Sequence, residues 1–282
     1  MPWFDRICRE CYSDPREVHR TLKRRGMDMV TITDHDSIDA GEALRRFSDF
    51  FLSEEVTCRM PSGTEVHIAV YDISERQHWQ LQARRRDFPA FVAYLREQHL
   101  FSSVNHIFSS LTGRRVAADF AWFSTCFPAF EVRNGHVPRC NNNAAAAYAQ
   151  ALGKTGLAGS DAHAVRSLAS AYVHVPGSRT KQEFLDGLRA GRVEVGGASG
   201  SVWKLTREVL ALGECMMREH PLSVLLAPLG ALVPLATLSN WVREVYAAQR
   251  WGRLTACAAA SQQGAWSDCA QPATPHDTRL VG

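Results

Sequence analysis

Short apolar runs alternate with helical segments along residues 1–199. The run at 27–33 is rich in β-branched residues and follows a helix signal, because Asp14 and Pro15 suit the start of a helix and Gly26 suits its end. Alternation of strands and helices predicts parallel βα units, whose strand carboxyl ends gather at one face. Further runs typical of short strands lie at 49–57, 65–73, 100–106, 129–135 and 170–176.

Helix signals lie in several of the intervals between these runs. Residues 74–99 form a long polar and apolar segment that Pro89 interrupts, and residues 143–152 are rich in alanine. Thr180 and Glu183 stand at the two positions of a capping box, which predicts a helix that starts there. These segments predict one α/β domain over residues 1–199.

The pattern changes from about residue 200, where we expect a helical extension over 200–252. Residues 221–241 contain no charged residue. The length of this segment is near the minimum for crossing a bilayer, but three prolines interrupt it. We expect 221–241 either to contact a membrane or to pack on the domain or on a partner. Residues 253–282 are small and polar, which predicts a disordered tail.

Composition narrows the class of protein only modestly. The 282 residues are 45% hydrophobic, enough for a sizeable core, and the net charge of +3 does not by itself indicate a nucleic-acid or membrane partner. The start lacks the features of a secretory signal, so we expect eight reduced cysteines in a cytoplasmic protein, membrane-associated if 221–241 binds lipid. The one compact pair, Cys8 and Cys11, is interpreted as incidental thiols.

Residues that can bind metals follow several of the predicted strands. Asp161 and His163 lie one residue apart, so in an extended segment their side chains point the same way. Glu55 and His67 interrupt predicted strands with polar groups that a buried strand does not otherwise explain. Imidazole and carboxylate together suit Zn, Mn or Fe. The other strand-end candidates for metal binding are Asp34, His35, Asp36 and His106. Arg133 and Arg166 lie just past two strand ends and are candidates for binding a phosphate.

These residues lie in motifs that resemble the PHP (polymerase and histidinol phosphatase) family. The resemblance covers roughly residues 12–197 and is carried by the motifs "TITDHDSIDAG", "SEEVT", "VHIAVYDI", "NHIF", "FEVRNG" and "GSDAHA", in that order. It implies a distorted (β/α)7 TIM-like barrel with two or three divalent metal ions and phosphoesterase activity. A multinuclear centre suits that chemistry, because phosphate esters need charge neutralisation and a hydroxide at neutral pH.

The resemblance also implies individual roles. The implied metal ligands are His35, Glu55, His67, His106, Asp161 and His163, with Glu55 bridging and Glu54 as its alternative if the strand slips by one residue. Asp34 would orient a ligand histidine or handle a proton, and Asp36 would do the same or cap the turn. Arg133 and Arg166 would clamp a phosphate, or would be ordinary surface residues.

One motif of the family has no counterpart in the printed residues. The family usually opens with D-x-H-x-H at the end of a first strand, whereas residues 1–11 contain no histidine. We therefore expect either an upstream strand that the given sequence does not include or a degenerate centre in a barrel without its first strand.

Three functions remain open at this point. The first is metal-dependent hydrolysis of a phosphate ester, on a small phosphorylated molecule or on a nucleotide or nucleic-acid end. The second is a non-catalytic scaffold with a binding or membrane-associated regulatory role, and the third is an amidohydrolase-like enzyme. No protein partner is indicated. We expect removal of residues 200–282 to leave the metal centre intact.

Overall fold

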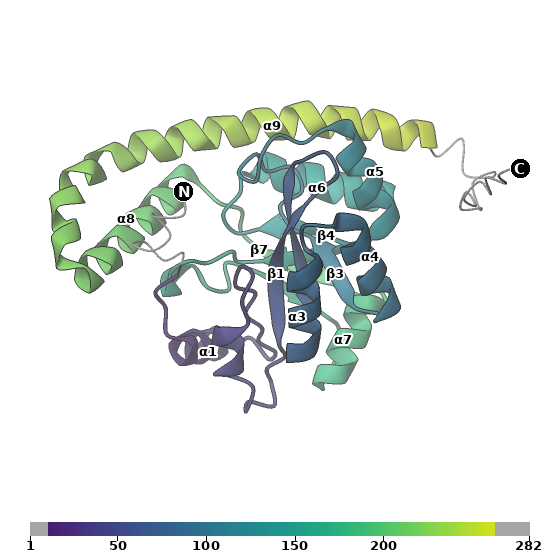
Figure 1. Ribbon diagram of the computed structural model, residues 1–282, viewed down its shortest axis with the longest axis horizontal. Helices are drawn as coiled ribbons and strands as arrows, with labels where there is room; N and C mark the ends of the chain where they lie inside the picture. Colours follow the sequence, from purple (N-terminus) through teal and green to yellow (C-terminus); the bar gives the residue numbers. More distant parts are fainter. Residues whose placement is uncertain (1–10, 263–282) are drawn as a thin grey trace, which may run out of the picture.

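The computed structural model describes residues 11–262, so the expectations for residues 1–10, Cys8 among them, and for 263–282 lie outside the described chain. A mixed sheet of five strands forms the centre of the domain (Figure 1). The strands lie in the order β1 (Ser53–Arg59), β2 (Glu65–Tyr71), β3 (Phe101–Val104), β4 (Ala129–Asn134) and β5 (Thr155–Gly159). β6 (Ala171–His174) and β7 (Glu194–Gly197) form a separate antiparallel pair.

The predicted parallel order holds for only part of the sheet. β3, β4 and β5 are parallel, but β1 pairs antiparallel with β2 and β2 pairs antiparallel with β3. A tight turn joins β1 to β2, with Gly63 at φ +85° and a hydrogen bond from the Met60 amide to the Thr64 carbonyl. Glycine adopts that backbone conformation at little cost. The two strands are therefore neighbours in an antiparallel hairpin, which differs from the parallel arrangement that we predicted.

The predicted (β/α)7 barrel is not confirmed, because the described residues contain no closed barrel. The expected strand at 27–33 forms no ladder. It makes one isolated bridge, between Val30 and Phe50, which precedes β1, and a second bridge just beyond it joins His35 to Glu55 of β1. An α/β fold is confirmed.

Helices cover one face of the sheet and enclose the main core. They are α3 (Glu75–Arg84), α4 (Phe88–Glu97), α5 (Ala117–Cys126) and α6 (Arg139–Ala151). The strands alternate, so Ile68 and Val70 face this core whereas His67 faces the opposite side. The opposite side of the sheet therefore carries the candidate metal ligands.

Shorter helices flank the opposite side. α1 (Pro15–Arg24) begins after Asp14, whose carboxylate accepts hydrogen bonds from two amides of the first turn, and the predicted cap is confirmed. α7 (Lys181–Arg189) has the predicted capping box between Thr180 and Glu183. The remaining short elements are α2 (Asp39–Glu42) and the 3-10 turn η1 (Val165–Ser167).

The extension consists of α8 (Val202–Glu219), the 3-10 segment η2 (Pro221–Leu232) and the long helix α9 (Val233–Gln262). Figure 1 shows α8, η2 and the start of α9 projecting beside the domain, and α9 then returning across it above α6. Residues 253–262 are helical, which differs from the predicted disordered tail. The stretch Leu222–Arg253 is long and apolar enough to cross a membrane by length and composition, and little of its most apolar part is buried.

Candidate metal centre

Three histidines surround the carboxylate of Glu55 on β1. His67 Nδ1 lies 2.9 Å from Glu55 Oε1, and His106 Nε2 lies 3.2 Å from the same oxygen. His35 pairs with Glu55 through the backbone bridge and stacks edge-on against His67, with ring centroids 4.4 Å apart. Ligand atoms of His35, Glu55 and His67 lie within 4.8 Å of one another. The structure thus brings four of the six predicted ligands together.

The contacts around Glu55 change the pKa values of its neighbours. Burial alone would raise the pKa of Glu55, but hydrogen bonds from His106 and His67 hold it well below its ordinary value. Burial also opposes protonation of His106, yet the contact with Glu55 outweighs it and raises the pKa of His106 to about 9. Burial lowers the pKa of His67. The contact between Glu55 and His106 therefore shifts their pKa values in opposite directions.

The two remaining predicted ligands lie together with a residue that the sequence analysis did not single out. Ligand atoms of Asp161, His163 and His136 lie within 4.8 Å of one another. Asp161 and His163 follow β5, and His136 follows the neighbouring strand β4. Burial would raise the pKa of Asp161, but the charges of His163, His136 and His106 outweigh it and lower that pKa.

A buried polar pair links the two groups. Glu131 accepts hydrogen bonds from the His106 amide at 2.8 Å and from Asn134 Nδ2 at 3.0 Å. Asn134 Nδ2 also lies 3.0 Å from Asp161 Oδ2. It therefore contacts the carboxylate of Glu131 on β4 and that of Asp161 after β5. Burial raises the pKa of Glu131 to about 7. The pair fixes the position of two predicted ligands.

Three of these positions leave their strands through a left-handed turn. Asp36, His106 and Asp161 have φ values of +54°, +29° and +49°. Asp and His adopt this conformation more readily than most residues, and such turns often occur at functional sites. The turns account for polar residues at abrupt strand ends.

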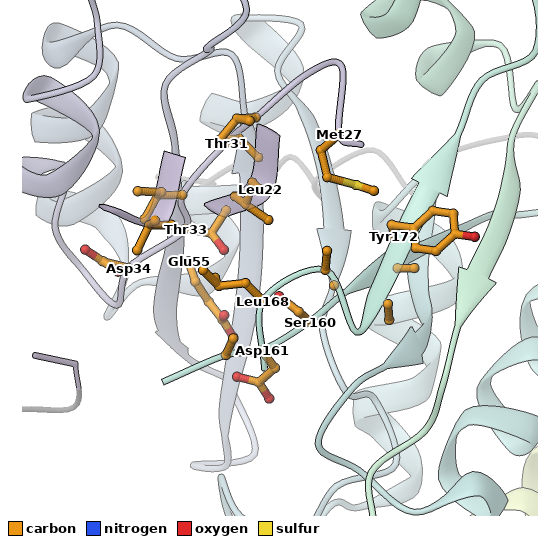
Figure 2. Close-up of a pocket in the computed structure, with 18 of the residues that line it drawn as sticks. Leu22, Met27, Thr31, Thr33, Asp34, Glu55, Ser160, Asp161, Leu168 and Tyr172 are labelled. Carbon is orange, nitrogen blue, oxygen red and sulfur yellow. The ribbon is translucent and has the colours of Figure 1, made fainter. Parts of the chain in front are cut away.

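The two groups open onto a cavity of about 850 Å³. Figure 2 shows Glu55 and Asp161 extending toward the same end of this cavity, whereas Leu22, Met27 and Thr31 line the opposite end. The cavity therefore has a polar end at the candidate ligands and a more apolar end beneath α1.

The register of β1 decides between the two adjacent glutamates. Glu54 is fully buried on the helix side, where it lies 2.7 Å from His78 and accepts a hydrogen bond from Gln82 at 2.9 Å. Glu55 faces the histidines. The structure therefore places Glu55, and not its alternative, at the candidate centre.

The two aspartates that flank His35 have different surroundings. Asp34 lines the cavity, and in Figure 2 its carboxylate points away from Asp161. Asp36 accepts a hydrogen bond from the Thr57 amide at 2.8 Å and pairs with Arg85 at 3.0 Å. These contacts favour the turn-capping role for Asp36. A direct catalytic role for either residue stays a prediction.

The two predicted phosphate-binding arginines do not line the cavity. Arg166 in η1 pairs with Glu208 of α8 at 3.5 Å and donates to the Arg207 carbonyl. Arg133 lies at the irregular pairing between β4 and β5, and its buried Nε has no hydrogen-bond partner among the described residues. Phosphate binding by either arginine stays a prediction.

Glu131 and His136 were not predicted from the sequence. Glu131 interrupts an apolar strand just as Glu55 does, so the same criterion could have found it. His136 lies one residue beyond the motif "FEVRNG" and has no periodic signal of its own. Only the fold brings it to Asp161.

Residues 140–193 match a family model described as PHP-associated, and the matched segment includes Asp161 and His163. Among curated proteins, no sequence matches this chain. The family match therefore covers the last two predicted ligands but not the group around Glu55.

Solved structures give further similarities. PsfC from Pseudomonas syringae PB-5123 is 15% identical with a TM-score of 0.51, over 72% of this chain and 88% of PsfC. The lesion-specific endonuclease EndoQ from Pyrococcus furiosus is 14% identical, with a TM-score of 0.47. The similarity covers 64% of this chain and 52% of EndoQ. A protein assigned as a metal-dependent phosphoesterase from Bifidobacterium adolescentis is 12% identical, with a TM-score of 0.42, over 67% of this chain and 93% of that protein. The likeness to PsfC indicates a shared fold, and the other two are too weak to carry a conclusion.

Proposed function

We propose that this chain is a member of the PHP family and a hydrolase that cleaves phosphate esters with divalent metal ions; the match of residues 140–193 to a PHP-associated family model supports this. The observation that carries the proposal is the convergence of His35, His67 and His106 on Glu55, with Asp161 at the same end of the cavity. Nothing in ordinary core packing requires three imidazoles around one carboxylate.

The donor set fits a metal centre. His67 Nδ1 and His106 Nε2 lie 3.2 Å apart, both close to one carboxylate oxygen, and His106 Nδ1 is buried with no hydrogen-bond partner among the described residues. Mixed imidazole and carboxylate ligands suit Zn, Mn or Fe, and we propose two or three such ions. When bound, they would neutralise phosphate oxygens and lower the pKa of a water molecule.

The chain's own residues would orient this centre and the substrate. Glu131 and Asn134 hold His106 and Asp161 in place through buried hydrogen bonds. Asp34, which lines the cavity, is the side chain that we propose to receive or deliver a proton. Asp36 would act indirectly, because Arg85 and the Thr57 amide hold it at the turn that presents His35.

The cavity supports a small phosphorylated substrate or the end of a nucleic acid. Its volume of about 850 Å³ lies in the range of small-molecule sites, and its polar end lies at the proposed ligands. Arg133 is retained as a phosphate-binding candidate on the basis of its charge. Arg166 is the weaker candidate, because Glu208 already pairs with it.

The function can be tested with substrates of three classes. Purified protein would be assayed on p-nitrophenyl phosphate, bis-p-nitrophenyl phosphate and an amide substrate, with Mn or Zn added. We expect hydrolysis of a phosphate ester that Asp161→Ala reduces at least about 100-fold, since it removes a ligand. Amide hydrolysis alone would favour an amidohydrolase-like enzyme. Metal binding without any turnover would favour the non-catalytic scaffold.

A second proposal concerns the extension. We propose that η2 and the start of α9 contact a lipid surface, because their leucines are exposed on an uncharged segment. Arg218 precedes this segment and Arg243 follows it, and long basic side chains suit the edge of a bilayer. The most exposed leucines are Leu222, Leu225 and Leu235, at 84%, 78% and 67%. Cytoplasmic location stays a prediction.

Vesicle sedimentation tests the lipid proposal. We expect the wild-type protein to sediment with phosphatidylcholine–phosphatidylglycerol vesicles, and Leu225→Asp combined with Leu229→Asp to stay in the supernatant. Leu111→Asp is the matched control, because Leu111 is equally exposed but lies on the α/β domain. Equal recovery of all three proteins with the vesicles, or of none, would contradict lipid contact through η2.

A further inference from the structure

His136 lies where no sequence motif placed a ligand. It follows β4 and faces the loop after β5, so that its ring centroid lies 5.7 Å from that of His163. A nitrogen of His136, a carboxylate oxygen of Asp161 and a nitrogen of His163 all lie within 4.8 Å of one another. Three ligand atoms at this spacing can share one cation.

The imidazole of His136 is buried without hydrogen bonds. Its side chain is 9% exposed, and neither ring nitrogen has a hydrogen-bond partner among the described residues. Burying a polar group without a hydrogen-bond partner is unfavourable. A bound cation would satisfy one of the two nitrogens.

Helix α8 supplies a carboxylate behind His136. Glu208 is 2% exposed, and its Oε2 lies 3.8 Å from His136 Nε2 with no hydrogen-bond partner in the described chain. The other oxygen of Glu208 accepts a hydrogen bond from Ser167 and pairs with Arg166 at 3.5 Å. A carboxylate beside a histidine commonly orients the ring of a metal ligand.

The same helix also holds the loop that carries His136. Lys204 Nζ donates to the Gly135 carbonyl at 2.6 Å and to Ser170 Oγ at 2.8 Å. A Cβ at Gly135 would lie 2.4 Å from Ser170 Oγ and 2.6 Å from the Ser160 carbonyl oxygen, so a side chain there would separate the two loops. The approach of His136 to Asp161 therefore depends on glycine at this position and on α8.

We propose that His136 is a metal ligand that shares one divalent cation with Asp161 and His163, and that Glu208 is the positioning residue for His136. Two imidazoles and one carboxylate suit Zn, Mn, Fe or Co. The inference rests on the metal centre in the proposed function, but not on turnover. It assigns the extension a part in building that centre.

Cobalt spectroscopy tests direct ligation. His136→Cys would be loaded with Co²⁺, since a thiolate bound to Co²⁺ gives a strong charge-transfer band in the near ultraviolet. His174→Cys is the matched control, because His174 is an exposed strand residue on β6, paired with Glu194 and away from the cluster. We expect the band in His136→Cys and not in the control or the wild type. If His136→Cys bound as much cobalt as the wild type but lacked the charge-transfer band, the proposal would be overturned.

A second variant covers a failure of the cysteine protein to fold. In His136→Asn we expect the loss of one equivalent of bound Co²⁺ by elemental analysis, with the circular dichroism spectrum retained. Full retention of cobalt in a folded His136→Asn protein would overturn direct ligation.

Glu208→Gln tests the positioning role separately. In calorimetry, we expect the Co²⁺ ion at His136 to bind about 10- to 100-fold more weakly. The total number of Co²⁺ ions bound per chain at saturation should stay the same. A purely structural role would change the melting temperature but not this affinity, and that result would overturn positioning. Wild-type protein that binds metal but hydrolyses nothing would contradict the proposed function alone.

Discussion

At the scale of the residue, the predicted ligands were recognisable because strand-end polar groups have few structural explanations. Asp34, His35 and Asp36 follow a β-branched run, and the structure brings His35 to Glu55. Asp36 shows the limit of this reasoning, because Arg85 comes from a helix far along the chain and only the fold reveals that pair. His136 was not predicted for the same reason, because only the fold brings it close to Asp161.

A residue-scale prediction concerns acid stability. Burial would raise the pKa of Asp49, but hydrogen bonds from Lys23 and His19 outweigh it and lower that pKa. A lowered folded-state pKa gives stability that is present above the unfolded value, near 3.8, and is lost as the pH falls through the folded value. Asp49→Asn should therefore lower the melting temperature at pH 7 and have less effect at pH 3.

Melting curves of wild type and Asp49→Asn at several pH values check this prediction. Asp186→Asn serves as the control, because Asp186 is an exposed aspartate paired within its own helix. A difference between wild type and Asp49→Asn that does not shrink at low pH would contradict the account.

At the scale of the element, helix starts were predictable and strand pairing was not. Asp14 and Thr180 cap their helices as local signals predict, since the cap bonds join neighbours in sequence. The residues Pro61, Ser62 and Gly63 are an equally local turn signal, and they lie in the β1–β2 hairpin, for which we predicted two strands but not their antiparallel pairing. The failure of 27–33 to form a ladder depends on pairing partners, which no local pattern specifies.

The hairpin turn gives an element-scale prediction. Gly63→Ala should reduce the free energy of unfolding by about 1 kcal/mol, because alanine is strained at φ +85°. Space is not the cause, as a Cβ there meets nothing within 4 Å.

Gly213→Ala in α8 is the matched control. It also has open space but an ordinary helical backbone, so it should be neutral or stabilising by up to about 1 kcal/mol. Urea denaturation of both variants gives the comparison. Equal effects of the two substitutions would contradict backbone strain at Gly63.

At the scale of the whole molecule, the extension is joined to the α/β domain by buried polar contacts. Glu244 of α9 accepts hydrogen bonds from the Ser110 amide and hydroxyl at 2.7 Å and 2.6 Å, and from Asn141 at 3.2 Å. Lys204 and Glu208 of α8 contact the loops of the candidate centre. The expectation that residues 200–282 can be removed without effect on the centre conflicts with these contacts.

The junction predicts a large effect at one buried carboxylate. Glu244→Ala should reduce the free energy of unfolding by about 1–3 kcal/mol, because it leaves the Ser110 amide without its acceptor and removes one of the two acceptors of Asn141 Nδ2. Glu214→Ala, which removes an exposed pair with Arg218, should change it by less than about 0.5 kcal/mol. Similar small effects of both variants in urea denaturation would contradict a structural role for this junction.

The central claim is that the residues around Glu55 and Asp161 bind divalent metal, and elemental analysis of purified protein tests it most directly. Wild type, His35→Ala, Asp161→Ala and the exposed control His174→Ala would be loaded with Mn or Zn and freed of excess metal. We predict at least two equivalents in the wild type and in His174→Ala, and a clear loss in both His35→Ala and Asp161→Ala. Metal content unchanged in those two variants, or absent from the wild type, would contradict the account.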